Sequence, residues 1–215
     1  RLWDRKGLPP AAVDYVEFVR MLNPDGKLRH YPGSPWLASQ LLRESDRLRL
    51  YELHGSDFKH LQECFASAGR RVTVTAGDGF AGLKAILPPP PRRALVLIDP
   101  SYETRDDYVN VVKCLKDALK RFPTGIYALW YPLLAKLEAH QLPGRLKNLG
   151  APNWLHATLE VRAPARDGIG LHGSGMFIIN PPWTLPDTLK SLMPWLVKAL
   201  GRDAGAGYRL DWHIN

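Results

Sequence analysis

The stretch Ala94-Leu-Val-Leu-Ile-Asp-Pro-Ser-Tyr-Glu103 decides the fold, because it has the pattern of a buried strand that ends in a polar turn. A short aliphatic run closed by Asp-Pro is typical of a parallel strand with both faces covered. Ligands of open α/β sheets bind outside the carboxyl ends of such strands. There, Asp99-Pro100-Ser101-Tyr102 would offer a carboxylate, a backbone carbonyl and an aromatic ring to a flat base with an exocyclic amine. An ordinary strand exit explains the same residues equally well.

Strands and helices alternate on both sides of this stretch. The apolar patterns predict strands at 48–53, 72–75, 94–98, 125–131, 154–161, 175–180 and 208–214, and helices at 57–68, 80–87, 106–121, 133–149 and 184–200. Two further helices are predicted upstream, one after Pro9-Pro10 and one that Ser34 could cap. This alternation predicts an α/β fold with a mostly parallel sheet. We divide it into a helical insert at residues 1–47 and a core at residues 48–215.

Composition limits the class of protein. The 215 residues are 45% hydrophobic and 23% charged, which is ordinary for a globular domain, and no apolar run reaches the length of a membrane span. The net charge of +8 favours a polyanionic partner. Cys64 and Cys114 lack metal-type spacing and fall on apolar helix stripes, so we expect reduced core thiols in a cytoplasmic protein that holds no metal and binds no membrane.

Several phrases, in order, carry a resemblance to a known family. Acidic residues follow three successive strands at Glu52, Asp78 and Asp99, and this looks like strands two to four of a Rossmann-like class I S-adenosylmethionine-dependent methyltransferase. The phrases Arg29-His-Tyr-Pro-Gly-Ser-Pro35, Glu52-Leu-His54, Leu97-Ile-Asp-Pro100, Ala128-Leu-Trp-Tyr-Pro132 and Ile179-Asn-Pro-Pro-Trp183 resemble the ribosomal RNA large subunit methyltransferase J family. The resemblance runs from about Asp14 to the C-terminus. It implies helices on both faces of the sheet and methyl transfer from S-adenosylmethionine to N6 of an adenine in 23S rRNA.

The chain departs from the family pattern in two ways. The first strand of the family, with its glycine-rich cofactor loop, has no counterpart upstream of Glu52, and the chain begins with Arg1 rather than Met. We therefore expect that this strand lies upstream of the sequence shown, and that a fold without it exposes two unpaired strand edges. The second departure is Ser101, which stands where the family has a second proline. The Pro100 carbonyl is retained, but the turn is less rigid.

The resemblance implies a role for each strand-end residue. Asp99 and the Pro100 carbonyl would accept the two N–H groups of the target amine, and Tyr102 would stack on the extruded base. Glu52 would bind the ribose hydroxyls of the cofactor, and Asp78 its adenine amine. The remaining predicted cofactor contacts are Gly79, which allows close backbone approach, Phe80, which packs on the ring, and Asp99.

Other residues are candidates for contact with RNA, and some alternatives stay open. Tyr131 could wall the target pocket, and Arg162, Arg166 and His172 lie in the loop of a predicted hairpin on the pocket side. Asn180-Pro-Pro-Trp183 competes for the catalytic role, but its strand should run antiparallel and end at the opposite edge. We expect a monomer that acts on 23S rRNA. The alternatives are a DNA adenine-N6 methyltransferase and a noncatalytic RNA-binding protein with the same fold.

Overall fold

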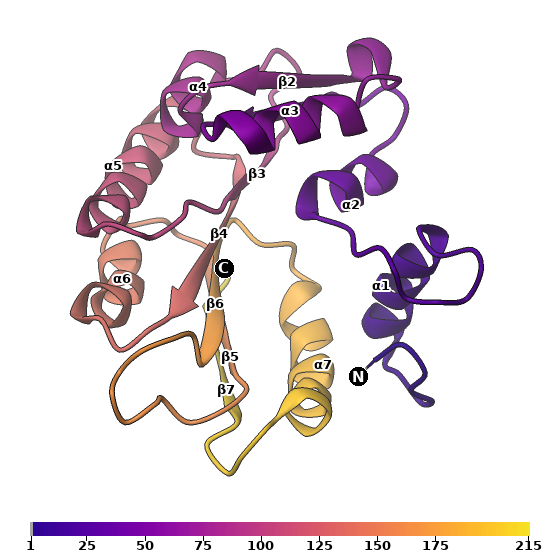
Figure 1. The fold of residues 1–215 in the computed structure, drawn as a ribbon. Helices are drawn as coiled ribbons and strands as arrows, with labels where there is room; N and C mark the ends of the chain where they lie inside the picture. Colours follow the sequence, from indigo (N-terminus) through magenta and orange to yellow (C-terminus); the bar gives the residue numbers. More distant parts are fainter. Residues whose placement is uncertain (1) are drawn as a thin grey trace. The chain divides into compact units, whose positions relative to one another are not determined.

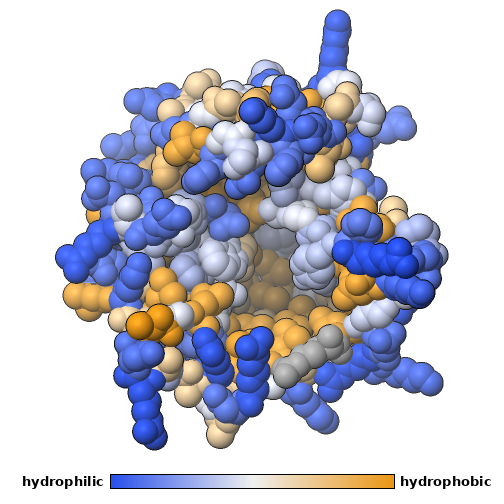
Figure 2. Space-filling view, in the orientation of Figure 1, coloured by the Kyte–Doolittle hydropathy of each residue, from blue (hydrophilic) through white to orange (hydrophobic). Residues whose placement is uncertain are grey.

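The computed structural model describes residues 2–215, which form two compact units, Leu2–Ile86 and Leu87–Asn215. The predicted boundary between residues 47 and 48 falls inside the first unit, so the separate helical insert stays a prediction. Hydrophilic side chains cover much of the face seen in Figure 2, with apolar side chains between them. Within residues 2–215, the structure contains no helix that combines the length and the apolar character of a membrane span.

The first unit is built around a two-stranded parallel sheet. It contains α1 (Pro10–Met21), α2 (Ser34–Leu41), β1 (Leu48–Glu52), α3 (Gly55–Cys64), a single 3-10 turn at Gly69–Arg71, β2 (Val72–Ala76) and α4 (Gly79–Ile86). β1 and β2 pair from Leu48 with Val72 to Glu52 with Ala76, and α3 is the crossover between them. Both strands therefore end at the same edge.

The second unit holds a five-stranded sheet in the order β3-β4-β6-β5-β7. Its elements are β3 (Leu95–Ile98), α5 (Arg105–Arg121), β4 (Ile126–Leu133), α6 (Leu137–Lys147), β5 (Trp154–Glu160), β6 (Gly173–Ile179), α7 (Leu185–Leu200) and β7 (Gly207–His213). β3 and β4 are parallel, and the other three neighbouring pairs are antiparallel. The largest fully buried side chains, among them Tyr108, Phe122, Tyr127 and Phe177, belong to this unit.

Helices cover both faces of the five-stranded sheet, as predicted (Figure 1). On one face, Tyr127 of β4 donates a hydrogen bond to the Phe122 carbonyl after α5, and Lys147 of α6 lies 4.3 Å from the ring centre of Trp154. On the other face, Lys190 of α7 lies 4.8 Å from the ring centre of Trp212. The catalytic candidates therefore follow an edge strand of a sheet that has helices on both faces (Figure 1).

The prediction of a mostly parallel sheet needs a correction. It holds for β1–β2 and β3–β4, but β6 lies antiparallel between β4 and β5. The reason is that residues 161–172 form a hairpin loop rather than a crossover helix, so the strand that follows must reverse direction.

The expected unpaired edges are present. Within residues 2–215, β1 pairs only with β2, and β3 pairs only with β4. Leu95 and Leu97 of β3 are 68% and 46% exposed.

The expectation that Cys64 is a core thiol is wrong, because Cys64 is exposed and α3 has no buried residue among those described.

Candidate active site

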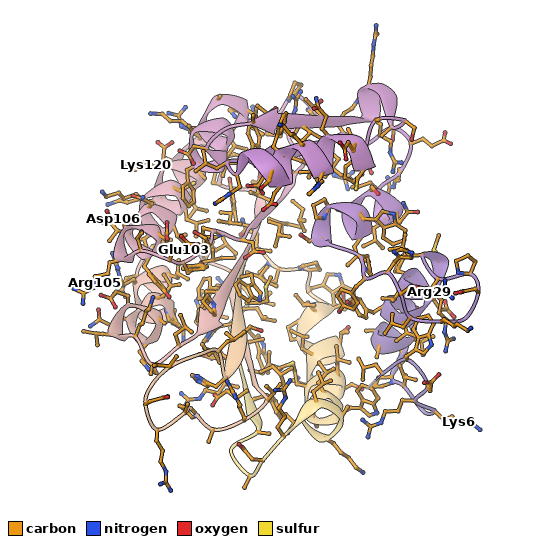
Figure 3. The ribbon with its side chains drawn as sticks, viewed as in Figure 1. Lys6, Arg29, Glu103, Arg105, Asp106 and Lys120 are labelled. Carbon is orange, nitrogen blue, oxygen red and sulfur yellow. The ribbon has the colours of Figure 1, made fainter. Side chains whose placement is uncertain are left out.

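Asp99-Pro100-Ser101-Tyr102 follows directly on β3, at the carboxyl end of that strand. The ladder between β3 and β4 ends at the pair Ile98 and Leu129, so the tetrapeptide lies beside the carboxyl half of β4. Asp99 is exposed, yet partial burial of its carboxyl group raises the pKa of Asp99 above its ordinary value. Glu103, Arg105 and Asp106 lie close together at the start of α5, whereas Lys120 lies near its far end (Figure 3).

Tyr102 does not face solvent. Its side chain is 2% exposed, its ring centre lies 4.8 Å from that of Tyr108 and 6.4 Å from that of Trp130, and its hydroxyl donates a 2.8 Å hydrogen bond to the Trp130 carbonyl. Its backbone is left-handed, with φ of +53°. The expected stacking of this ring on an extruded base is therefore not the arrangement seen here, because the ring is already packed in the interior.

Tyr131, the candidate for a wall of the target pocket, and His172, a candidate for contact with RNA, are also buried. Tyr131 is 1% exposed, and its hydroxyl lies 2.7 Å from Nε2 of His156. The His172 side chain is buried, and its backbone N–H donates to the Leu133 carbonyl while its own carbonyl accepts from Val161. Neither side chain is open to a bound RNA in this arrangement.

The two arginines of the hairpin loop differ in their surroundings. Because Gly173 pairs with Leu133 on one side and Glu160 on the other, residues 161–172 lie at the carboxyl end of β4. Nη2 of Arg162 donates a 3.0 Å hydrogen bond to the Leu171 carbonyl and so braces the loop. Arg166 is exposed near the tip, where its charge is accessible to a phosphate group.

Asn180 belongs to the opposite end of the five-stranded sheet. Its side-chain amide donates 2.8 Å hydrogen bonds to the carbonyls of Pro123 and Gly125, which precede β4, and its backbone N–H donates to the Asn153 carbonyl. The amide that would have to hold a target amine is thus engaged by the backbone. The structure therefore separates Asn180-Pro-Pro-Trp183 from the carboxyl end of β3.

Glu52 and Asp78 lie at one edge of the first unit, because Glu52 ends β1 opposite Ala76 and Asp78 follows two residues later. Oε1 of Glu52 accepts a 2.7 Å hydrogen bond from the His54 N–H, and Oδ1 of Asp78 accepts a 2.9 Å bond from the Phe80 N–H. Within residues 2–215 the second oxygen of each carboxylate has no hydrogen-bond partner. Two oriented acceptors at neighbouring strand ends fit the hydroxyl and amine donors of a nucleoside.

Gly79 and Phe80 open α4 directly after Asp78. A Cβ at Gly79 would meet only Tyr51, at 3.6 Å, so the backbone is approachable there. Asp99 lies in the other unit, so the prediction that Glu52, Asp78 and Asp99 face one cleft stays a prediction. Among residues 2–215 there is no group of three or more His, Cys, Asp or Glu side chains suited to a metal ion.

Sequence reasoning missed two contributors to the second unit. The first is Trp130, whose backbone carbonyl is the acceptor for the Tyr102 hydroxyl. His156 was not singled out, although it holds the hydroxyl of Tyr131. No sequence pattern could have found the first, because every residue has a carbonyl. The second depends on the order of the strands.

Comparison with known proteins identifies the family. The family model described as "Ribosomal RNA large subunit methyltransferase D, RlmJ" matches residues 1–214. The chain is 44% identical over 213 residues to the Ribosomal RNA large subunit methyltransferase J of Haemophilus influenzae, covering 99% of this chain and 75% of that protein. It is 43% identical over 215 residues to the enzyme of the same name from Escherichia coli, covering 100% of this chain and 76% of that protein.

A solved structure agrees with these matches. The crystal structure of a protein from Legionella pneumophila superposes with a TM-score of 0.89 at 32% identity, covering 98% of this chain and 77% of the other. The chain therefore spans about three quarters of the length of these relatives. On the strength of the whole-chain family match and the two named relatives, the chain belongs to the large-subunit ribosomal RNA methyltransferase J family.

Proposed function

We propose that this protein transfers a methyl group from S-adenosylmethionine to N6 of an adenine in 23S rRNA. Membership of the family supports the reaction class and the substrate class. The observation that carries the assignment to particular atoms is the position of Asp99 and Pro100, which directly follow the last residue of β3. At that position a carboxylate and a backbone carbonyl lie at the ligand-binding end of an α/β sheet.

The chemical problem is the low nucleophilicity of the adenine amine. Its nitrogen lone pair is delocalised into the ring, and it becomes available when the nitrogen pyramidalises. The Asp99 carboxylate and the Pro100 carbonyl would accept the two N–H groups and favour that geometry. Positioning and fixed electrostatics then provide the catalysis, and no covalent enzyme intermediate is required.

The cofactor site would be formed by the strand ends of the first unit. Glu52 would accept from the ribose hydroxyls and Asp78 from the adenine amine, with Gly79 and Phe80 beside the adenine. Asp99 is the remaining proposed cofactor contact. S-adenosylmethionine supplies a methyl group on a positively charged sulfur, which makes it electrophilic. The free carboxylate oxygens of Glu52 and Asp78 support this assignment.

The RNA surface is proposed to include Arg166 at the tip of the hairpin loop. The net charge of +8 favours attraction of a phosphate backbone. Because the relatives are ribosomal RNA enzymes, we also propose that the protein works in the cytoplasm, and we propose a monomer, which sedimentation of the full-length protein would test.

The test of the function is methyl transfer by the full-length protein to unmodified 23S rRNA, with N6-methyladenine identified by mass spectrometry after nuclease digestion. Asp99→Ala should abolish transfer while the thermal unfolding curve keeps its cooperativity. Glu103→Ala is the matched control, because it removes an exposed carboxylate four residues away. Transfer by Asp99→Ala at the rate of the control would show that the site assignment is wrong. Duplex DNA as a competing substrate, and calorimetry with S-adenosylmethionine, test the two alternatives.

A further inference from the structure

The turn after β3 is attached to β4 beyond the end of the backbone ladder. The last ladder pair is Ile98 with Leu129, and Trp130 is the next residue of β4. The carbonyl of Trp130 accepts the hydrogen bond from the hydroxyl of Tyr102. This side-chain bond therefore continues the connection between the two strands past the point where their backbones separate, across the segment that contains Asp99 and Pro100.

Tyr102 is held in a backbone conformation that needs such support. A φ of +53° is left-handed, which is unfavourable for a residue with a Cβ and persists only where surrounding contacts determine it. Those contacts are the ring packing against Tyr108 and Trp130 and the bond to the Trp130 carbonyl. Burial raises the pKa of Tyr102 well above its usual range, and the neighbouring Tyr108 and Asp99 add to this effect. The hydroxyl thus keeps its proton and remains a donor.

We propose that Tyr102 is a positioning residue, whose hydroxyl anchors the Asp99–Ser101 turn to the Trp130 carbonyl and so fixes the two acceptors for the target amine, while its ring stays in the interior. The inference rests on the proposed function and deepens it. The hydrogen bond of Tyr102 would also compensate for the less rigid turn at Ser101, where the family has a proline, because Tyr102 is the next residue in the chain.

The role separates cleanly from base stacking, because the two depend on different parts of the side chain. Stacking needs the ring, which Phe retains. Anchoring needs the hydroxyl, which Phe lacks. Tyr108 provides a matched control from the same aromatic cluster, since it is 1% exposed and, within residues 2–215, its hydroxyl has no hydrogen-bond partner. Tyr108→Phe therefore removes a buried hydroxyl without breaking a bond.

The experiment compares Tyr102→Phe, Tyr108→Phe and wild type as full-length proteins in steady-state methylation of 23S rRNA. We expect kcat of Tyr102→Phe to fall about tenfold or more, because a small misplacement of reacting groups costs up to about 100-fold. KM values for RNA and for S-adenosylmethionine should stay within about twofold, because the binding contacts are kept. Tyr108→Phe should match wild type. A wild-type kcat in Tyr102→Phe, or a loss confined to KM for RNA, overturns the positioning role.

A second measurement needs no variant and so does not depend on folding of Tyr102→Phe. An RNA with 8-azidoadenine at the target position is photocrosslinked to the wild-type protein, and the labelled peptide is identified. Labelling of Tyr102 would place its ring against the base and overturn the inference, whereas labelling that leaves Tyr102 unmodified supports it. If wild type forms no N6-methyladenine, the proposed function fails and this inference falls with it. If wild type and Tyr108→Phe are active and Tyr102→Phe is equally active, only the positioning role fails.

Discussion

The hydroxyl of Tyr131 on β4 lies 2.7 Å from Nε2 of His156 on β5, across the strand that separates them. Burial raises the pKa of Tyr131 above its ordinary value. The pKa of His156 is lowered to about 4, and burial is the largest cause. The positive charges of Lys147 and Arg209 lower the pKa further, while Asp211 opposes them. The tyrosine thus keeps its proton and the histidine stays neutral, and one hydrogen bond joins the hydroxyl and Nε2.

This pair predicts a loss of stability in mild acid. A histidine with a folded pKa near 4 and an unfolded pKa near 6.5 binds a proton more readily when unfolded, so its contribution is complete above about pH 6.5 and is lost as the pH falls toward 4. The shift corresponds to an upper limit of about 3 kcal/mol. In urea unfolding at pH 7 and pH 4.5, His156→Gln should lose less stability than wild type on acidification. Exposed His140→Gln should lose as much as wild type, and equal losses in all three proteins would contradict the assignment.

Gly175 is predicted to be needed for the packing of Tyr131 in this pair. It is the β6 residue opposite Tyr131, and a Cβ there would lie 2.3–2.5 Å from ring atoms and the hydroxyl of that tyrosine. Because the ring is buried and its hydroxyl is bound to His156, it cannot move aside cheaply. Gly175→Ala should lower the free energy of unfolding by about 1–3 kcal/mol. Gly144→Ala, in an exposed turn of α6 with no atom near the new Cβ, should be neutral or stabilising. Similar results for both would argue against the steric explanation.

Most of the fold follows from local signals in the sequence. The predicted helix at 106–121 differs from α5 by one residue at its start, because α5 begins at Arg105. The local signals are strong there: Asp107 accepts a hydrogen bond from the Thr104 N–H, and an amphipathic pattern continues to Arg121. The predicted strand at 175–180 begins at Gly173 instead, since glycines have weak strand propensity and only pairing with Leu133 and Glu160 extends it. Strand order was not available from local pattern, because β6 enters between β4 and β5 through long-range pairing.

The candidate site was less predictable than the fold. The spacing of strand ends placed Asp99 at the carboxyl end of β3, and the direction of β6 placed Asn180 at the opposite end. Aromatic residues were harder to assign, because a tyrosine after a strand fits both a solvent-facing and a buried position. Tyr102 and Tyr131 were assigned to the pocket, and both are buried with hydrogen-bonded hydroxyls. Their partners are 28 and 25 residues away, at positions that only the tertiary structure brings close.

Asp99 predicts an acid limb in the rate of methyl transfer. The carboxyl group must be ionised to accept an N–H group, and its pKa is raised, so kcat should rise with pH through a pKa above the ordinary aspartate value. Asp99→Asn keeps one side-chain oxygen that can accept an N–H, but it cannot ionise. We expect partial activity with no acid limb from this variant in single-turnover assays. An unchanged acid limb in Asp99→Asn would assign the titration to another group.

Asn180 should matter for stability and not for the chemical step. Replacing it with Ala breaks two hydrogen bonds to the Pro123 and Gly125 carbonyls and leaves a Cβ at φ of +52°. The free energy of unfolding should fall by about 1–3 kcal/mol. Asn180→Gly also loses the amide but tolerates the left-handed backbone, so its loss should be smaller. Both variants should keep kcat below their melting temperatures, and a stable variant without activity would return Asn180-Pro-Pro-Trp183 to consideration as the catalytic tetrapeptide.

Arg166 predicts a measurable change in the salt dependence of RNA binding. Its exposed guanidinium lies in the loop at the carboxyl end of β4, which is also the end at which Asp99 follows β3. We therefore expect a phosphate of a bound substrate to lie near Arg166. Each phosphate contact releases counterions and adds about one to the slope of log affinity against log salt concentration. Arg166→Ala should reduce that slope by about one in filter binding of 23S rRNA fragments. Arg93→Ala is the control, since exposed Arg93 precedes β3 and lies at the other end of the strand, and its slope should equal that of wild type. Equal reductions in both variants would mean that net charge, rather than a contact at the hairpin loop, attracts the RNA.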